Sequence, residues 1–317
     1  MERGEGSTKI AGVDVGKRRL DAAVHGLEDE LAVENTTAGV GELIAWLRAH
    51  KVGRVGLEAT GGYERLVRTA LEQAGFEVVV HQPLEVRLFA KLKRRRAKND
   101  RLDARLIAAA TVQVDAVRAA RDRRLVELAE RLTAYELITD KVADLKTFLE
   151  SVALKDVTVT IGASLRSLER TKAKLAAEIL ARIKAFPDLL ARFRLLLSLP
   201  GVGPIVAATL VIRMPELGAM RRGQAASLIG VAPFDRDSGQ WKGLRFIQGG
   251  RSRPRRMLYL AALQARRCSP SLKAFADNLA ARGKPKKLII VAVMRKLAEA
   301  ANLILRRGQP WLKQATT

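Results

Sequence analysis

The stretch that most restricts the fold of this chain lies in its middle, at residues 118–186, which contain one glycine and no proline. Little in such a stretch interrupts a helix. Apolar residues recur every three or four positions in two runs, 125–152 and 161–186, which is the spacing of one helix face. The sequence therefore predicts two long amphipathic helices, with a break near 153–162 and an end at Pro187.

Two such helices predict an antiparallel hairpin or a coiled coil. In one interpretation the hairpin packs against the rest of its own subunit. In the other it is an arm through which subunits associate. The spacing of apolar residues is compatible with both.

The residues before this region alternate between strand and helix patterns. Short apolar strands are expected at 9–15, 20–26, 31–34, 52–57 and 76–80. Helices are expected at 40–49, at 63–74 and from Pro83 onwards. Three hairpin-like strands followed by alternating helices and strands predict an α/β fold with a mixed sheet.

Four carboxylates of this α/β region form a candidate metal site. Asp14 lies inside an apolar strand, where a charge is costly unless it is paired or binds a cation. Glu58 ends a strand before a Gly-rich turn, and ligands commonly bind at such strand ends. Asp100 and Asp103 begin a predicted helix, three residues apart and on one face. Carboxylates in this order suit Mg²⁺, which leaves coordination positions for phosphate oxygens.

Each carboxylate also has a purely structural explanation. Asp14 could accept hydrogen bonds from backbone N–H groups, and Glu58 could cap the next helix or pair with Arg65. Asp100 and Asp103 could be an N-cap and a first-turn residue favoured by the helix dipole. The order of all four on this strand pattern is more specific than any one of them.

Positive charge is concentrated at the C-terminal end. Residues 187–317 contain 24 Lys and Arg against 6 Asp and Glu, and so carry +18 of the net charge of +24. This surplus indicates a polyanionic partner, either nucleic acid or an acidic membrane surface. The uncharged run 195–212 is interrupted by PGVGP, so we expect two short buried pieces and no membrane span.

Three kinds of segment are candidate phosphate contacts. A basic run precedes the predicted helix at 100 and includes Lys93, Arg94, Arg95 and Arg96. A helix–GVGP–helix pattern could bind a phosphate through the turn at Gly201 and Gly203, or could be only a tight turn between buried helices. Two cationic segments nearer the C-terminus supply Arg251, Arg255, Arg256, Lys284, Lys286 and Lys287.

Ser238 lies in the loop DRDSGQWKG, between an apolar helix and an expected β-ribbon. A serine before a glycine is usually a turn residue. A hydroxyl flanked by carboxylates and followed by arginines is also a candidate nucleophile at phosphorus, because cations stabilise the charge that develops there.

Cysteine and histidine usage excludes several other site classes. The single cysteine, Cys268, excludes an internal disulfide framework and an all-cysteine zinc site. The three histidines are scattered without metal-ligand spacing. Since the N-terminus has no apolar signal core, we expect a cytoplasmic protein.

Seven strings, in order from about residue 9 to 308, resemble the DEDD-type insertion-sequence transposases of the IS110 family, which are bridge-RNA-guided recombinases. The strings are GVDVGKRRLDAAV, LEATGGYERLV, KNDRLDARLIA, LPGVGPIVAATL, GVAPFDRDSG, IQGGR and ARGKPKKLIIVAVMRKL. The glycine motifs are weak individually, but the ordered set is highly specific and covers nearly the whole chain.

The resemblance implies three parts. Residues 1–116 would form a RuvC-like, RNase H-type domain, residues 117–187 a coiled-coil arm, and residues 188–317 a mostly helical transposase domain with a helix-hairpin-helix-like element. It assigns Mg²⁺ to the DEDD set of Asp14, Glu58, Asp100 and Asp103. It also makes Ser238 the nucleophile that forms a covalent phosphoserine link to DNA.

The resemblance further implies a dimer of dimers, in which the serine of one subunit completes the carboxylate site of another. A noncoding bridge RNA would pair with donor and target DNA, at the bacterial nucleoid. Two rival functions stay open. One is a RuvC-like metal-dependent nuclease or junction resolvase in which water attacks and Ser238 is structural. The other is a non-catalytic scaffold that binds RNA and DNA.

Overall fold

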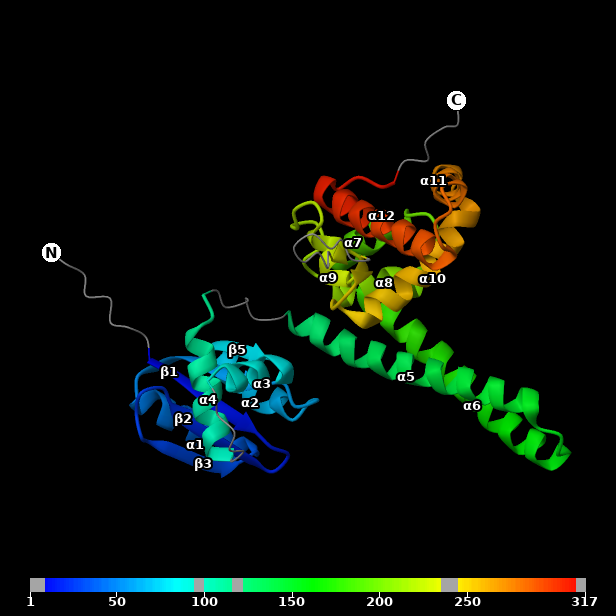
Figure 1. Ribbon diagram of the computed structural model, residues 1–317. Helices are drawn as coiled ribbons and strands as arrows, with labels where there is room; N and C mark the ends of the chain where they lie inside the picture. The colour runs from blue at the N-terminus through cyan, green and yellow to red at the C-terminus, as the bar shows by residue number, and fades with distance from the viewer. Residues whose placement is uncertain (1–8, 94–99, 116–121, 235–244, 312–317) are drawn as a thin grey trace. The chain divides into compact units, whose positions relative to one another are not determined.

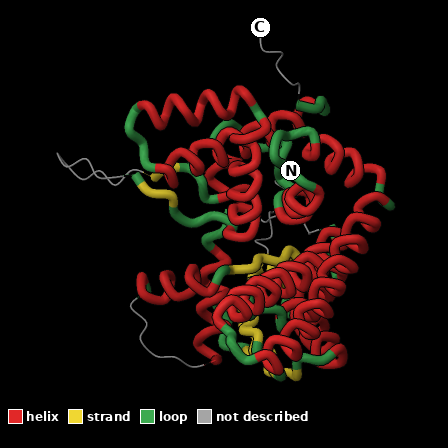
Figure 2. Tube along the Cα trace, turned by 90° about the vertical axis from the view of Figure 1, so that its right-hand side faces the viewer, coloured by secondary structure: helices red, strands yellow, loops and turns green. Residues whose placement is uncertain are grey.

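The structure is a computed structural model that describes residues 9–93, 100–115, 122–234 and 245–311, with only the backbone of 100–102. The chain forms two compact units, Met1–Arg121 and Asp122–Thr317 (Figure 1). The described part of the second unit is almost entirely helical, whereas the first contains a five-stranded sheet (Figure 2). The helical region in the middle of the chain thus belongs to the same compact unit as the C-terminal helices.

The sheet of the first unit has the strand order β3-β2-β1-β4-β5. Its strands are β1 (Lys9–Val15), β2 (Arg19–Val24), β3 (Glu30–Glu34), β4 (Val52–Glu58) and β5 (Glu77–His81). The first three pair antiparallel through short turns, while β4 is parallel to β1 and β5 to β4. Parallel neighbours need a crossover connection, which the intervening helices supply. The mixed α/β fold predicted for this region is confirmed.

Helices lie on both faces of this sheet. They are α1 (Thr37–Ala49), α2 (Glu64–Gln73), α3 (Pro83–Leu92) and α4 (Asp100–Val112). Leucines and valines of α1 and α2 pack with one face of the strands in a single buried cluster. On the other face lies α4, against which α3 packs through Val86 and Ile107.

Two glycines let α4 lie directly on the sheet. Gly12 of β1 and Gly56 of β4 are in register on neighbouring strands. A Cβ on Gly12 would overlap the backbone of Ala104 and Ala108, and a Cβ on Gly56 would overlap the Thr111 hydroxyl. Because any side chain at these positions would push the helix away, the glycine pair sets the distance between α4 and the sheet.

The second unit begins with the two predicted long helices, α5 (Arg123–Ser151) and α6 (Lys155–Lys184). The break between them is much shorter than the predicted 153–162, because the β-branched run 157–161 lies inside α6. Such residues lower helix propensity by only about half a kcal/mol each, which packing readily overcomes. The helices that follow are α7 (Pro187–Leu197), α8 (Pro204–Arg213), α9 (Gln224–Ile229), α10 (Ser252–Cys268), α11 (Pro270–Ala281) and α12 (Lys286–Arg307).

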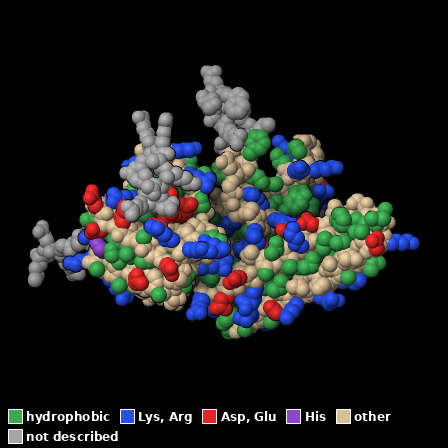
Figure 3. Space-filling view, turned by 90° about the horizontal axis from the view of Figure 1, so that it is seen from below, with side chains coloured by type: hydrophobic (Ala, Val, Ile, Leu, Met, Phe, Trp, Pro, Cys, Tyr) green, Lys and Arg blue, Asp and Glu red, His purple; other side chains and the backbone are tan. Residues whose placement is uncertain are grey.

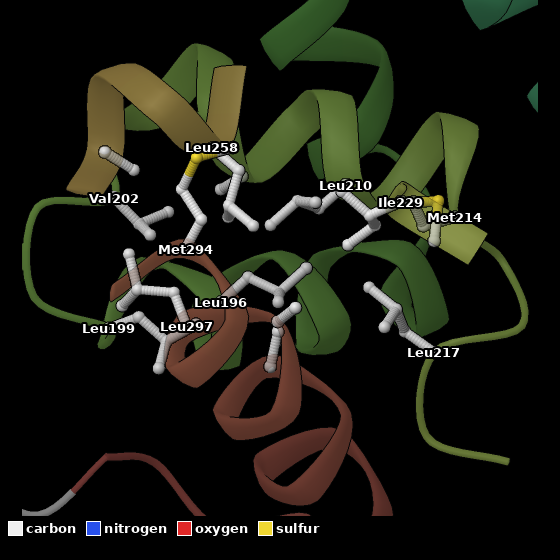
Figure 4. Close-up of a cluster of buried hydrophobic side chains, with 14 of the residues drawn as sticks. Leu196, Leu199, Val202, Leu210, Met214, Leu217, Ile229, Leu258, Met294 and Leu297 are labelled. Atoms are coloured by element: carbon white, nitrogen blue, oxygen red, sulfur yellow. The ribbon is translucent and has the colours of Figure 1, made fainter. Parts of the chain in front are cut away.

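The base of the α5–α6 hairpin is part of the core of the C-terminal helices. Leu128 and Leu132 of α5, with Ile179 and Ile183 of α6, belong to one buried cluster with residues of α7, α8, α10 and α12. Figure 4 shows the centre of that cluster, where Leu196, Leu210, Leu258, Met294 and Leu297 converge. The hairpin therefore packs against its own subunit at its base. Its far end exposes Phe148, Leu154 and Val159, and hydrophobic side chains are visible along it in Figure 3.

The uncharged run at 195–212 forms the end of α7, a turn and most of α8, as two pieces separated at PGVGP. This α7–turn–α8 element matches the predicted helix-hairpin-helix-like arrangement. No helix in the described part of the chain is long and apolar enough to cross a membrane.

A buried carboxylate connects α5 to two C-terminal helices. Glu136 is 6% exposed, accepts a hydrogen bond from Arg213 of α8 at 2.9 Å and pairs with Arg253 of α10. Burial lowers the pKa of the Arg213 guanidinium, which also donates to Thr133 of α5 at 2.9 Å. Removing one member of such a cluster leaves an uncompensated buried charge.

We predict that Gly12→Ala destabilises the N-terminal unit by about 2 kcal/mol, since the new methyl group has no space against α4. Hydrogen exchange of the β1 and β4 amides, measured by mass spectrometry, would accelerate. Gly41→Ala is the control, because this helical glycine has open space around it. That variant should be neutral or more stable by about 0.5 kcal/mol. Equal exchange in the two variants would contradict the close packing of α4.

We predict that Glu136→Gln lowers the free energy of unfolding of the helical unit by about 3 kcal/mol. Asp144→Asn is the matched control on the same helix, because its 3.3 Å pair with Lys141 is exposed and should contribute under about 0.5 kcal/mol. Urea denaturation followed by circular dichroism measures both. Equal midpoints for the two variants would refute the structural role of Glu136.

Candidate functional site

Two of the predicted carboxylates lie side by side at one edge of the sheet. Asp14 follows Gly12 by two residues along β1, and Glu58 follows Gly56 by two along β4. Since side chains alternate between the faces of a strand, both carboxylates lie on the face that α4 covers. The last paired residues of these strands are Val13 and Leu57, so Asp14 and Glu58 are the next neighbours.

Asp103 lies in the chain next to the point where α4 packs on β1. It precedes Ala104, whose backbone lies against Gly12, and it is therefore close in the chain to the point where helix and strand touch. Asp14, Glu58 and Asp103 are all partly buried. Asp100 is the first residue of α4, but its side chain is outside the described residues.

Several other predicted site residues are outside the described part of the chain: Ser238, Arg94, Arg95 and Arg96. The described strands β6 (Pro233–Phe234) and β7 (Phe246–Ile247) pair antiparallel on either side of the segment that contains Ser238. One strand of the β-ribbon therefore comes before Ser238 in the sequence and the other after it. The sequence-based prediction, in contrast, put the serine before the whole ribbon. A two-residue strand at Pro233 is too short to produce an alternating pattern that the sequence could reveal.

The turn after Glu58 is held by a different carboxylate. Glu64 accepts hydrogen bonds from the Thr60 N–H at 3.2 Å, the Thr60 hydroxyl at 3.1 Å and the Gly62 N–H at 2.8 Å. Burial raises the pKa of Glu64, but the hydrogen bonds from backbone N–H groups outweigh this effect and lower it. These donors of the turn are thus satisfied by Glu64, in the capping role that was one structural alternative for Glu58.

His81 lies beside Glu58 in the register of β4 and β5 and was not singled out by the sequence. Its Nε2 is 2.8 Å from the Thr111 hydroxyl, which donates to the Ile107 carbonyl at 2.7 Å, so the Nε2–H of His81 is the donor. Burial lowers the pKa of His81, against the opposing effect of the Glu85 charge. This neutral histidine anchors α4 to the sheet behind the carboxylates.

Asp21 of β2 is a second residue that sequence reasoning missed. It pairs directly with Asp14 across the β1–β2 hairpin and is 7% exposed. Arg19 donates to one Asp21 oxygen at 2.7 and 3.0 Å. A pocket of about 190 Å³ is lined by Asp21, Glu30 and Ala104, among others. The signal that could have revealed Asp21 is the short turn at Gly16–Lys17, which determines which residues of the two strands face each other.

The donor chemistry of this edge fits a hard divalent cation, since β1, β4 and α4 contribute carboxylate oxygens only. Among the described side chains, which do not include Asp100, no three His, Cys, Asp or Glu groups lie close enough to enclose a metal ion. An ion held here would draw on further oxygen ligands, such as Asp100 or the phosphate oxygens of a nucleic acid.

The GVGP turn of the second unit has two distinct glycines. Gly201 has a φ of +75°, and a Cβ there would overlap the backbone of α10 at Ala261 and Ala265. Gly203 is the N-cap of α8 and has open space around its Cα. The first glycine therefore serves the packing of the turn, and a phosphate contact at this turn stays a prediction.

The three predicted phosphate-binding arginines have partners within their own unit. Arg251 pairs with Glu216 at 2.5 Å, Arg255 donates to the Gly249 carbonyl at 2.7 Å, and Arg256 pairs with Asp140 at 2.6 Å. Lys286 and Lys287 are exposed at the start of α12, and Lys284 is exposed just before it. Lys93 is exposed at the end of α3, with its Nζ 5.7 Å from the Phe89 ring. Lys and Arg side chains are spread over the face seen in Figure 3.

The chain is similar in sequence to known proteins and, over part of its length, in structure to one solved protein. The chain is 26% identical to the pilin gene-inverting protein of Moraxella bovis, over 97% of this chain and 99% of that protein. It is 28% identical to an uncharacterized 43.6 kDa protein of insertion element IS110 from Streptomyces coelicolor, over 61% of this chain and 49% of that protein. RuvC of Thermus thermophilus in complex with a Holliday junction substrate matches 32% of this chain and 92% of its own, at 15% identity and a TM-score of 0.27.

Two family models match different parts of the sequence. The DEDD transposase model of the IS110 family matches residues 11–157, which include the four carboxylates. A second model, described as a transposase of the IS116/IS110/IS902 family, matches residues 193–277, which include Ser238. Because these matches together cover most of the sequence, the chain belongs to the IS110 family of transposases, which are enzymes that act on DNA.

Proposed function

We propose that this transposase is a site-specific DNA recombinase that cuts and rejoins DNA through a covalent link between Ser238 and a DNA phosphate. The observation that supports the proposal is that Asp14 and Glu58 directly follow the register partners Val13 and Leu57, on the face of the sheet covered by α4. Asp103 precedes Ala104, whose backbone lies against Gly12 of β1. This is the arrangement in which a DEDD carboxylate set would act on phosphate groups.

In the proposed reaction the Ser238 hydroxyl oxygen attacks a DNA phosphorus. A serine–phosphate ester forms, the bond from phosphorus to the 3′-oxygen breaks, and the proton lost by the serine balances the one gained by the released 3′-hydroxyl. Rejoining is the reverse attack by a 3′-hydroxyl. Since the number of phosphoester bonds is constant, no ATP is required.

Asp14, Glu58, Asp100 and Asp103 would hold the Mg²⁺ ions of this site. When bound, such ions stabilise negative charge on the attacking and leaving oxygens of phosphoryl transfer. The carboxylates orient the ions, and the partial burial of Asp14, Glu58 and Asp103 reduces competition from water.

We also propose that a noncoding bridge RNA guides the enzyme to donor and target DNA. The enzyme would act as a dimer of dimers in the bacterial cytoplasm. The +18 charge of residues 187–317 supports contact with phosphate backbones. If base pairing selects the site, the protein needs to recognise only shape and backbone. Lys284, Lys286 and Lys287 are exposed and can make such contacts.

The test is to trap the covalent intermediate. DNA in which sulfur replaces the bridging 3′-oxygen would give an adduct that does not rejoin, because the released thiol is a poor nucleophile at phosphorus. We predict an adduct with the wild-type protein and its copurified RNA, and none with Ser238→Ala. Asp14→Asn and Asp103→Asn should reduce adduct formation by about a thousandfold or more. Denaturing gels with labelled DNA measure all four proteins.

Ser252→Ala is the control for the serine, since Ser252 is exposed at the start of α10, and it should retain the adduct. Free nicked ends produced by an active Ser238→Ala protein would favour the RuvC-like nuclease instead. DNA processing that is undiminished in cells carrying either aspartate variant would favour the non-catalytic scaffold. Adduct formation that survives ribonuclease treatment would contradict the guide RNA.

A second prediction concerns subunit cooperation. If the serine of one subunit completes the carboxylate site of another, mixing Ser238→Ala with Asp103→Ala should restore up to about a quarter of the wild-type activity, as random mixing predicts. The control replaces Asp103→Ala by the double variant carrying both substitutions, which supplies no serine and should restore nothing. The absence of restoration between two folded, RNA-bound variants would indicate a self-contained site.

A further inference from the structure

We propose that Asp21 is a positioning residue of the carboxylate site and that the Asp21–Arg19 ion pair sets the affinity of this site for divalent ions. The inference rests on the proposed function, because it concerns the ions that Asp14 would help to hold. Neither Asp21 nor Arg19 belongs to the four carboxylates or to the predicted nucleic-acid contacts.

The register of the β1–β2 hairpin carries the geometry. Asp14 and Asp21 are direct antiparallel partners, which places their Cβ atoms about 5 Å apart on the same face of the sheet. That face is the one that α4 covers, since Ala104 of α4 and Asp21 line the same pocket. Asp21, Asp14 and Glu58 therefore form a row across three neighbouring strands.

Burial makes the charge of Asp21 effective over this distance. Its side chain is 10% exposed, so water screens it poorly from Asp14. Like charges this close repel each other unless a cation lies between or beside them. Arg19 supplies one such cation, and its guanidinium is 2.7 Å from an Asp21 oxygen.

The Arg19 side chain, in contrast, is 59% exposed, so the cation of the pair is more accessible to solvent than the carboxylate. The Asp21–Arg19 pair lies next to Asp14, one of the proposed metal ligands, so its charges act on that ligand. Here Asp21 adds negative charge beside Asp14, and Arg19 offsets part of it. The balance between the two decides how strongly the edge attracts a divalent cation.

This balance predicts opposite effects for the two halves of the pair. Asp21→Asn removes a negative charge and leaves Arg19 near Asp14, so the affinity for Mn²⁺ should fall about fivefold. Arg19→Gln leaves the Asp21 charge uncompensated, so the affinity for Mn²⁺ should rise about fivefold. Titration calorimetry of the full-length protein with Mn²⁺ alone, without DNA, measures both. The Mg²⁺ concentration that gives half-maximal adduct formation should shift in the same directions.

Glu77→Gln is the matched control, because it breaks a 2.9 Å ion pair with Arg54 between β4 and β5 at the opposite end of the strands. It should leave the Mn²⁺ affinity unchanged. The thermal midpoint of each metal-free variant shows that it is folded, and a purely structural role would move only these midpoints.

The proposal is overturned if Asp21→Asn and Arg19→Gln change the Mn²⁺ affinity in the same direction, or not at all, while Asp14→Asn abolishes binding. That result would leave the proposed metal site intact. If Asp14→Asn and Asp103→Asn also leave Mn²⁺ binding unchanged, the carboxylate site itself is refuted, and the role of Asp21 with it.

Discussion

The close packing of α4 on the sheet is the contact on which the candidate site depends. Gly12 and Gly56 stand side by side on β1 and β4, and the helix backbone lies against them where side chains would otherwise project. Two residues further along each strand, the same face carries Asp14 and Glu58. The contact between the glycines and α4 therefore lies two residues from the candidate metal ligands on both strands.

The residues around the candidate carboxylates have structural roles of their own. Glu64 takes the hydrogen bonds of the turn after β4, and His81 holds α4 through Thr111. Glu64 thus caps the turn, which was one structural alternative for Glu58. Asp21 and Arg19 complete the charge distribution on the β2 side.

The arginines of the helical unit illustrate the difference between net charge and available charge. Arg213 and Arg253 hold the buried Glu136, while Arg251 and Arg256 pair with Glu216 and Asp140. These side chains connect α5, α8 and α10, so part of the positive charge is used inside the fold. A large surplus of exposed cations still remains for a polyanion, because residues 187–317 contain only six acidic residues.

The sequence by itself predicted the strands and helices of the α/β region, the two hairpin helices and the family, and it proposed the four carboxylates as a site. Strand alternation, helix spacing and the prolines at helix starts are local signals, and each can be read within one segment. Only the tertiary structure decided that Asp21 faces Asp14, that His81 anchors α4 and that Arg251 and Arg256 are internally paired. These facts depend on strand register and on helix packing between distant segments. A single residue of slip would move each side chain to the opposite face without changing any local pattern.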